Sequence, residues 1–236
     1  MKPKPPYALF WKDKDMADTK KKTGLYFGSF NPVHAGHLIV AEHIAWHTDL
    51  DQVWLVVSPH NPFKEKSSLA SDYDRLEMVN LAIEGYDRLR ACDAEFRLPK
   101  PSYTCDTLIH LSEKYPSRDF SLIVGADSLI GFERWKNYEF ILKYFSLYIY
   151  PRPGYENTSP VIEGSRFKVI EGAPQVEVSA SAIRRDIALG RSVKALVPPA
   201  VLSYMEKNGC PIREDVPAFS FSWRNNADDV FIAVDE

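Results

Sequence analysis

The sequence predicts an α/β fold in which a doubly wound parallel sheet carries helices on both of its faces. One observation is that apolar runs such as VWLVVS, residues 53–58, are continuous rather than alternating, as in strands buried on both faces. Another is that segments with helical spacing, such as residues 36–47, alternate with these runs, and this alternation favours parallel pairing. The 236 residues, 45% of them hydrophobic, suit one large domain with its own core.

Each expected strand is a short apolar run bounded by turn-forming residues. GLYFG ends in Gly28, FSLIVGAD ends in Gly-Ala-Asp, and FSLYIY is followed at once by PRPGY. ACDAEF and RFKVIEG complete the set. The expected strands are residues 24–28, 53–58, 91–96, 120–127, 145–150 and 166–172.

Each expected helix has apolar residues three and four positions apart, and two helices carry end signals. Ser71 with Asp74 three residues later resembles a capping box, and Gly190 fits the position just after a helix. The expected helices are residues 36–47, 71–83, 104–115, 179–190 and 199–209. The second of them is expected to turn Tyr73, Leu76, Val79 and Ile83 toward the core.

The two ends of the chain differ from the middle. Residues 1–22 are rich in Lys and Pro and are predicted to be a disordered arm without the features of a secretory signal. Residues 23–209 are predicted to form a single domain. Residues 210–236 form a tail of unknown role, in which DDVFIAVD could add a strand. No apolar run approaches the ~18–20 residues of a membrane span, so no membrane partner is expected.

Charge and cysteine usage narrow the class of protein. The net charge is −3, so no global basic field favours nucleic acid, although a local anion site can still be built from amides and a few side chains. Cys92, Cys105 and Cys210 are odd in number and lack paired spacing, which argues against a disulfide framework. We therefore expect a reducing, cytoplasmic location.

The stretch GSFNPVHAGH, residues 28–37, follows the first expected strand and opens the first helix. Gly28 would let the backbone pass close to a ligand. Gly36 and His37 open a helix whose N–H groups and dipole favour an anion, and His34 adds another donor. The stretch therefore predicts a phosphate site, although the chain has no Walker lysine pattern.

The histidines have two other interpretations. His34 and His37 could be ordinary surface loop residues. They could also begin a metal site with His43 and His47, but no cysteine or acidic residue at a matching spacing completes the set of ligands. Phosphate binding is the interpretation that the neighbouring glycines favour.

A second polar stretch, VSASAIR, residues 178–184, lies near the carboxyl end of the domain. Ser179 and Ser181 fit the N-cap and first turn of a helix, where hydroxyls and amides can hold phosphate. Arg184 supplies a fixed cation whose fork geometry suits phosphate oxygens. Taken alone, the stretch favours an ordinary capped helix over a phosphate site.

Together, in this order, the two stretches resemble the signatures of the HxGH nucleotidyltransferase superfamily. GSFNPVHAGH is similar to G-x-F-D-P-x-H-x-G-H, with Asn31 where Asp is commoner, and VSASAIR is similar to I-S-S-T-x-I-R, with Ala180 in place of a common Ser. The resemblance implies a Rossmann-like sheet. Further strings over roughly residues 23–209 resemble bacterial nicotinate-nucleotide adenylyltransferases: SPHNPFK (58–64), PSYTCDTL (101–108), IVGADSL (123–129), FERWKNYEFIL (132–142) and YPRPGY (150–155).

The resemblance implies adenylyl transfer from ATP to nicotinate mononucleotide, which gives nicotinate adenine dinucleotide and pyrophosphate. His34, His37 and Arg184 would be the catalytic residues. Mg²⁺ would bridge the phosphates, held mostly by ATP and water, so no protein metal site is expected. The implied ATP contacts are Gly28, Ser29, Phe30, His34, Gly36, His37, Gly125, Asp127, Ser179, Ser181, Ile183 and Arg184.

The resemblance also implies a pocket for the mononucleotide. Trp135 would offer a stacking face to the ring, Tyr103 and Thr104 would hold an anion at a helix start, and Lys64 and Arg152 would meet phosphates. Each also has a structural interpretation: Trp135 as core, Lys64 and Arg152 as solvated charges, and Asp127 as a helix cap.

Several related functions stay open at this point. Pantetheine-phosphate adenylyltransferases and cytidylyltransferases share the superfamily, but SYTCDTL and the Trp135 segment disfavour both. A nicotinamide mononucleotide enzyme would differ in one or two contacts. A non-catalytic nucleotide-binding module is disfavoured by the intact histidines and Arg184. A homo-oligomer is possible.

Overall fold

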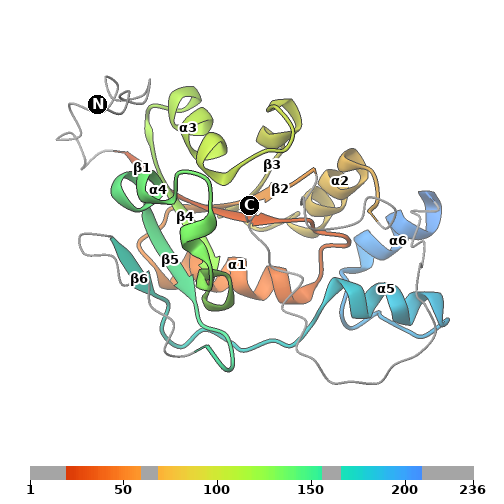
Figure 1. Ribbon diagram of the computed structural model, residues 1–236. Helices are drawn as coiled ribbons and strands as arrows, with labels where there is room; N and C mark the ends of the chain where they lie inside the picture. The colour runs from red at the N-terminus through yellow and green to blue at the C-terminus, as the bar shows by residue number, and fades with distance from the viewer. Residues whose placement is uncertain (1–19, 60–68, 156–165, 209–236) are drawn as a thin grey trace.

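The computed structural model describes residues 20–59, 69–155 and 166–208. Its centre is a parallel sheet of six strands in the order β3-β2-β1-β4-β5-β6 (Figure 1). The doubly wound parallel sheet predicted from the sequence is thereby confirmed. The strands are β1 (Lys21–Gly28), β2 (Gln52–Val57), β3 (Leu89–Cys92), β4 (Arg118–Gly125), β5 (Ser146–Tyr150) and β6 (Phe167–Val169).

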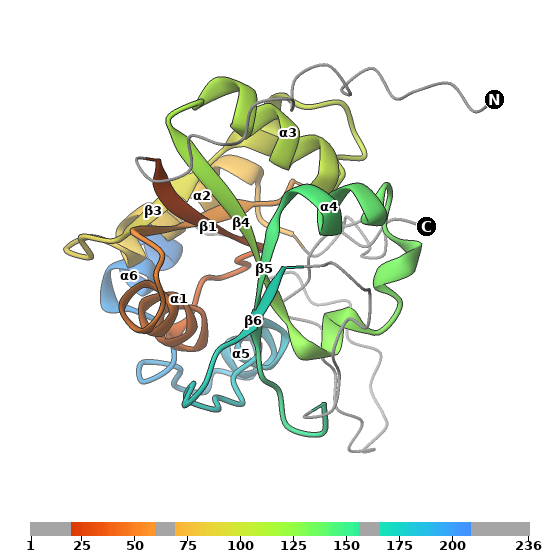
Figure 2. The ribbon, with the colours of Figure 1, turned by 90° about the vertical axis from the view of Figure 1, so that its left-hand side faces the viewer.

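Helices cover both faces of the sheet because side chains of each inner strand alternate between two apolar clusters. In β1, Tyr26 belongs to the cluster beneath α1, whereas Leu25 and Phe27 belong to the cluster beneath α3. Figure 2 shows α1, α5 and α6 on one side of the sheet and α3 and α4 on the other. The α-helices are α1 (Ala35–His47), α2 (Asp72–Ala82), α3 (Thr104–Lys114), α4 (Tyr138–Tyr144), α5 (Ala180–Ala188) and α6 (Pro199–Asn208).

Helix α4 was not among the expected helices, and three further differences bear on the site. Strand β1 begins at Lys21, which pairs with Arg118, so the end of the predicted disordered arm is part of the sheet. The strand expected at 91–96 is wrong in its second half: β3 ends at Cys92, and Ala94–Arg97 form a 3-10 helix. The chain curls there because the buried Glu95 carboxylate accepts hydrogen bonds from Ser102 and Thr107.

The third difference is the orientation of α2. Its buried residues are Arg75, Met78, Val79 and Ala82. Tyr73, which the sequence placed on the buried face, is 74% exposed. The helix is turned so that a charged side chain, rather than Tyr73, points inward.

Two further observations concern the expectations on cysteines and membranes. Cys92 and Cys105 are free and buried, and burial raises the pKa of the Cys92 thiol to about 11. Within the described ranges, no helix is long and apolar enough to cross a membrane. Cys210 and the tail strand considered at DDVFIAVD lie outside the described residues.

Candidate active site

The candidate site lies at the carboxyl edge of the sheet, where the strand order reverses between β1 and β4. Ligands of open α/β sheets bind at such a reversal, because the chain leaves the two neighbouring strands toward opposite faces. Residues that follow β1 and β4 and residues at the starts of α1, α3 and α5 therefore come together here. In Figure 1, α5 lies beyond the edge of the sheet, on the side from which α1 begins.

The loop after β1 is shaped by Phe30. Its backbone is left-handed, with φ of 47°, and its buried ring covers Gly28. A Cβ at Gly28 would lie 2.8 Å from that ring, so the glycine makes room for the Phe30 side chain. The Phe30 ring also meets the His37 ring edge-on, with centroids 4.9 Å apart. The Phe30 side chain therefore has a core role beneath His37, and the ATP contact predicted for this residue stays a prediction.

The two histidines form a stacked pair at the start of α1. His34 and His37 are each 1% exposed, and their ring centroids are 3.7 Å apart. The His34 backbone N–H donates to His37 Nδ1 at 3.3 Å. A neutral His37 ring therefore carries its proton on Nε2, where it is a donor.

His34 is the less satisfied of the two. Neither of its ring nitrogens makes a hydrogen bond to any residue that the structure describes. Burial, with smaller effects of His37 and Arg152, lowers the pKa of His34 far below its ordinary value. Its ring is thus neutral, with one nitrogen able to donate and one able to accept. The alternative metal set is not assembled, because His43 and His47 form a separate stacked pair.

Contacts between residues far apart in the sequence join the two signatures into one site. Arg184 Nη1 donates to the carbonyl of Asn31 at 2.6 Å, across 153 positions in the chain, and Nη2 donates to Ser181 Oγ at 3.0 Å. A Cβ at Gly36 would lie 3.1 Å from the His34 ring and 3.5 Å from Val178 Cβ. Gly36 therefore leaves room for the His34 ring, whereas a side chain there would make only an ordinary contact with Val178.

The ATP contacts predicted at Ser179, Ser181 and Ile183 lie in different surroundings. Ser179 is the N-cap as expected, and its hydroxyl accepts from the Ala182 amide at 3.1 Å. Ser181 stands beside Arg184. The Ile183 side chain is fully buried in the core and its amide donates to the Ser179 carbonyl, and the ATP contact predicted for this residue stays a prediction.

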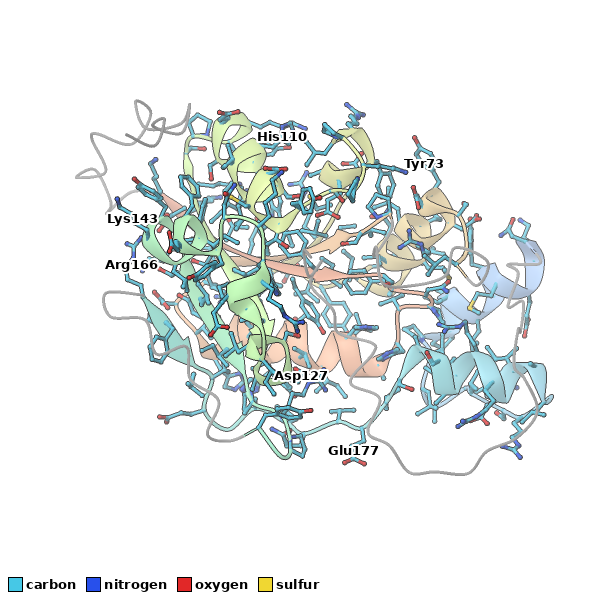
Figure 3. All side chains as sticks on the ribbon, viewed as in Figure 1. Tyr73, His110, Asp127, Lys143, Arg166 and Glu177 are labelled. Atoms are coloured by element: carbon cyan, nitrogen blue, oxygen red, sulfur yellow. The ribbon has the colours of Figure 1, made fainter. Side chains whose placement is uncertain are left out.

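A long ion pair joins residues that follow β4 and β5. Arg152 Nε lies 4.0 Å from Asp127 Oδ1, and neither atom makes a hydrogen bond to a described residue. Burial raises the pKa of Asp127, and the Arg152 charge opposes the rise. Gly125 is packed against Asp127 Oδ1 so closely that a side chain would collide with it. Figure 3 labels Asp127 just past the end of β4, and Glu177 on the segment that leads into α5.

The start of α3 supplies the other predicted anion site. Tyr103 is the N-cap of the helix, with Lys136 Nζ 4.1 Å from its ring centroid. Thr104 is fully buried, yet its hydroxyl makes no hydrogen bond to a residue of the described ranges. A buried hydroxyl at the start of a helix suits a small anion, because the dipole of the helix favours negative charge there.

Trp135 is not the open stacking platform that the sequence predicted. Its ring is 2% exposed and packs against Phe132, with centroids 4.6 Å apart. It belongs to the apolar cluster beneath α3 and α4, because the segment after β4 folds back over the sheet. Its indole Nε1 is buried without a partner among the described residues. Lys64 lies outside the described residues.

Sequence reasoning missed Arg75 and the part played by Asn31. Arg75 is 0% exposed and its guanidinium lies among backbone carbonyls beside the loop after β1. Asn31 Oδ1 accepts from the Ala70 amide at 3.1 Å, so this residue holds the loop to the segment before α2. One signal was available: Arg75 stands four positions before Val79, on the apolar side of an amphipathic helix.

The segments that form the site share one property. Buried polar side-chain atoms without a hydrogen-bond partner in the described structure gather at the carboxyl edge, although such groups are normally paired. Most come from the loops after β1, β2, β4 and β5 and from the start of α3; Tyr26 in β1, Glu42 and His43 on α1, and Trp135 in the core also carry such atoms. Those at the edge are His34 Nδ1 and Nε2, Ser58 Oγ, Thr104 Oγ1, Asp127 Oδ1 and Arg152 Nε.

Comparison with known proteins gives a consistent result. Residues 25–186 match the model of the cytidylyltransferase-like family. The probable nicotinate-nucleotide adenylyltransferase of Flavobacterium psychrophilum is 49% identical over 186 residues, which cover 78% of this chain and 96% of that protein. Its counterpart in Cytophaga hutchinsonii is 50% identical over 180 residues, which cover 76% of this chain and 93% of that protein.

A solved structure of similar shape is the nicotinic acid mononucleotide adenylyltransferase of Plasmodium falciparum complexed with NaAD. It superimposes with a TM-score of 0.67 over 80% of this chain and 96% of that one. The two sequences are 19% identical, so this likeness shows the shared fold.

Proposed function

The chain belongs to the nicotinate-nucleotide adenylyltransferases of the cytidylyltransferase-like family, and we propose that the site at the carboxyl edge carries out their reaction. In that reaction the adenylyl group of ATP passes to nicotinate mononucleotide, which yields nicotinate adenine dinucleotide and pyrophosphate in NAD biosynthesis. The observation that carries the assignment to this site is the gathering of unpartnered buried polar atoms at the reversal of strand order.

The reaction requires positioning more than acid–base chemistry. A phosphate oxygen of the mononucleotide attacks the α-phosphorus of ATP, a new P–O bond forms, and the bond to the leaving pyrophosphate breaks. The attacking phosphate is already anionic, so no general base is needed. Catalysis then rests on alignment of the two phosphates and on donors placed where negative charge develops.

The donors have distinct proposed places. His37 Nε2–H faces the α-phosphate, because its other nitrogen accepts from the His34 backbone. His34, with two unpaired ring nitrogens in the described structure, is a second phosphate contact. Arg184 and Ser181 hold the β- and γ-phosphates, since the contact of Arg184 to Asn31 fixes the guanidinium beside the loop that precedes the histidines.

Mg²⁺ fits this site as a partner of ATP rather than of the protein. Among the described residues, no three side chains of the His, Cys, Asp or Glu type gather to hold a metal ion. Mg²⁺ commonly keeps several waters and binds through substrate phosphates. When bound with ATP, it would neutralise part of the phosphate charge, and the side chains named above would do the rest.

The mononucleotide is proposed to lie between α3 and the segment after β5. The start of α3, with the Thr104 hydroxyl and the amides beside Tyr103, suits the ring carboxylate. Arg152, whose buried Nε makes no hydrogen bond to a described residue, suits the phosphate. Lys64 stays a predicted phosphate contact, and Trp135 would form the wall of the ring pocket rather than an open platform. Asp127 is proposed to accept from a nucleotide hydroxyl.

Location and assembly follow the sequence-based expectations as proposals. Free, buried Cys92 and Cys105 support a reducing compartment, and on that ground we propose the cytoplasm. A homo-oligomer stays a prediction.

The direct test is pyrophosphate release with Mg²⁺–ATP and one of three acceptors: nicotinate mononucleotide, nicotinamide mononucleotide or phosphopantetheine. We expect release with nicotinate mononucleotide at a kcat/KM at least about tenfold above that with the nicotinamide form, the scale of one lost anion contact. Equal use of both nicotinic forms would overturn the carboxylate site at α3. Release with phosphopantetheine alone would overturn the proposed acceptor.

A further inference from the structure

Arg75 is an arginine that the reaction described above does not use. It lies on α2, is 0% exposed, and donates to the backbone from three of its nitrogens. Nη1 donates to the Ser29 carbonyl at 2.6 Å and to the Ser58 carbonyl at 2.8 Å. The remaining contacts of the guanidinium are Nη2 to the Pro59 carbonyl at 3.2 Å, Nη2 to Asp72 Oδ1 at 2.7 Å, and Nε to the Ala70 carbonyl at 3.2 Å.

These contacts join the exits of two neighbouring strands. Ser29 is the first residue after β1, and Ser58 the first after β2. A fixed Ser29 carbonyl fixes the peptide plane that leads into Phe30 and so the start of the loop that carries His34. Arg75 therefore sets the path of the nucleotide loop without being a part of that loop.

If Arg75 only filled space in the core, an apolar residue could take its place. Burial lowers the pKa of Arg75, while the charges of Asp72 and Glu95 raise it, and a buried ion is often replaceable by an apolar residue without loss of stability. Met78 and Val79, its neighbours on the buried face of α2, are apolar. Five donors in a rigid fork give what an apolar residue cannot, namely fixed directions for several carbonyls at once.

Glu95 is a second buried charge, and it lies beside the start of α3 as Arg75 lies beside the nucleotide loop. Glu95 is 0% exposed and lies in the 3-10 helix after β3. Its Oε1 accepts from Thr107 Oγ1 at 2.9 Å, and its Oε2 accepts from Ser102 Oγ at 3.2 Å. Ser102 and Thr107 stand on either side of Tyr103 and Thr104, so Glu95 fixes the start of α3.

We propose that Arg75 and Glu95 are the positioning residues of the two halves of the active site, Arg75 for the nucleotide loop and Glu95 for the acceptor segment. This inference rests on the proposed function, because it assigns ATP to the one half and nicotinate mononucleotide to the other. Both residues act through the backbone or side chains that they hold, and neither touches the reacting atoms.

Arg75→Lys tests the nucleotide half, because lysine keeps the charge but loses the fork. We expect kcat/KM for ATP to fall about 10- to 100-fold, since small misplacements near a reacting group have effects of this size, while KM for nicotinate mononucleotide changes less than threefold. Arg88→Lys is the matched control: Arg88 also donates to a backbone carbonyl, that of Ala45, at the far end of α1. It should leave both constants within twofold.

Glu95→Gln tests the acceptor half, because glutamine keeps one acceptor oxygen and replaces the other by a donor. We expect the opposite split: kcat/KM for nicotinate mononucleotide falls about tenfold or more, and KM for ATP changes less than threefold. Glu113→Gln, at an exposed position on α3, is its control. Constants within twofold of wild type in both variants, or KM values that rise equally for both substrates, would overturn the proposal.

Two further measurements distinguish failure of this proposal from misfolding of a variant and from failure of the proposed function. If Arg75→Lys does not fold, Asp72→Asn weakens the same guanidinium from its partly exposed partner, and a loss confined to the mononucleotide would contradict the assignment. If the wild type binds Mg²⁺–ATP by calorimetry but does not turn over the mononucleotide, the proposed function fails. In that case Arg75→Lys must still weaken ATP binding about tenfold or more, and an unchanged affinity overturns its role.

Discussion

The two edges of the sheet differ in how completely the hydrogen bonds of some of their polar side chains are satisfied. Near the amino edge, Asp49 accepts hydrogen bonds from Lys22 at 2.8 Å, Lys168 at 2.6 Å and Tyr148 at 2.6 Å. At the carboxyl edge, His34 and Thr104 are more deeply buried yet carry atoms without a partner in the described structure. Figure 3 labels Arg166 at the start of β6 and Asp127 beyond β4, so the two edges can be located in one view.

The difference separates stability from function. A satisfied cluster such as that of Asp49 contributes to folding and needs nothing else. An unsatisfied buried group costs free energy in the unliganded protein, and that cost is recovered only when a ligand supplies the missing partner. Substitutions at the two edges should therefore separate: those at the carboxyl edge change turnover, and those at the amino edge change stability.

The largest effect is expected for His37→Ala. Loss of a preorganised donor to the α-phosphate should lower kcat about 10²- to 10³-fold or more, with the fold retained. The measurement is pyrophosphate release with circular dichroism as the check of folding. His47→Ala, from the other stacked pair on α1, is the control. Near-native kcat in His37→Ala would remove that residue from the mechanism.

Arg184→Ala is expected to come next. The loss of charge-assisted hydrogen bonds to phosphate should cost about 2–3 kcal/mol in kcat/KM for ATP, or roughly 30- to 150-fold. Arg185→Ala, one position on and exposed, should stay near wild type. An unchanged kcat/KM for ATP in Arg184→Ala would mean that the contact to Asn31 is structural only.

Because of His34, the stability of the folded protein is expected to depend on pH. Its pKa is lowered in the folded protein by burial, so below its unfolded pKa of about 6.5 the unfolded state binds the proton more readily and stability falls. His34→Asn should remove this loss, so that the variant gains about 2 kcal/mol relative to wild type between pH 7 and pH 5. Denaturant unfolding at both pH values measures it, and parallel pH curves for the two proteins would contradict it.

The smallest effect is expected at the amino edge. Burial raises the pKa of Asp49, but hydrogen bonds from Lys168, Lys22 and Tyr148 outweigh it and hold that pKa well below its usual range. Its stabilisation is therefore present above about pH 4, the unfolded value, and is lost as pH falls further. Because the side chain is 39% exposed, Asp49→Asn should cost only about 0.5–1 kcal/mol at pH 7.

Two readouts check Asp49→Asn. The difference in unfolding free energy from wild type should shrink below about pH 4, while kcat stays unchanged. Asp87→Asn, at an exposed position, serves as the control. A fall in kcat without a loss of stability would break the separation of the two edges.

The sequence predicted the sheet and the two signatures well because both depend on local patterns. Continuous apolar runs marked the inner strands, and GSFNPVHAGH with VSASAIR marked the residues that Arg184 and Asn31 bring together. It predicted less well where burial decides the role of a residue. Phe30, Ile183 and Trp135 lie inside motifs but pack in the core, and no spacing rule distinguishes a motif residue that faces a ligand from one that faces away.

The charges that organise the site were the hardest to foresee. Arg75 and Glu95 bind carbonyls and hydroxyls from loops distant in sequence. Arginine and glutamate are usually exposed, so their burial becomes visible only when those loops are placed in space.

The measurement that tests the central claim most directly is NMR of the ¹⁵N-labelled histidine rings during titration with Mg²⁺–ATP. His34 and His37 should shift on binding, because the phosphates contact both rings and supply partners to the unpaired nitrogens of His34, whereas His43 and His47, stacked farther along α1, should not. Shifts confined to His43 and His47, or unchanged His34 and His37 signals in a protein that turns over ATP, would contradict the assignment of the nucleotide site to the carboxyl edge.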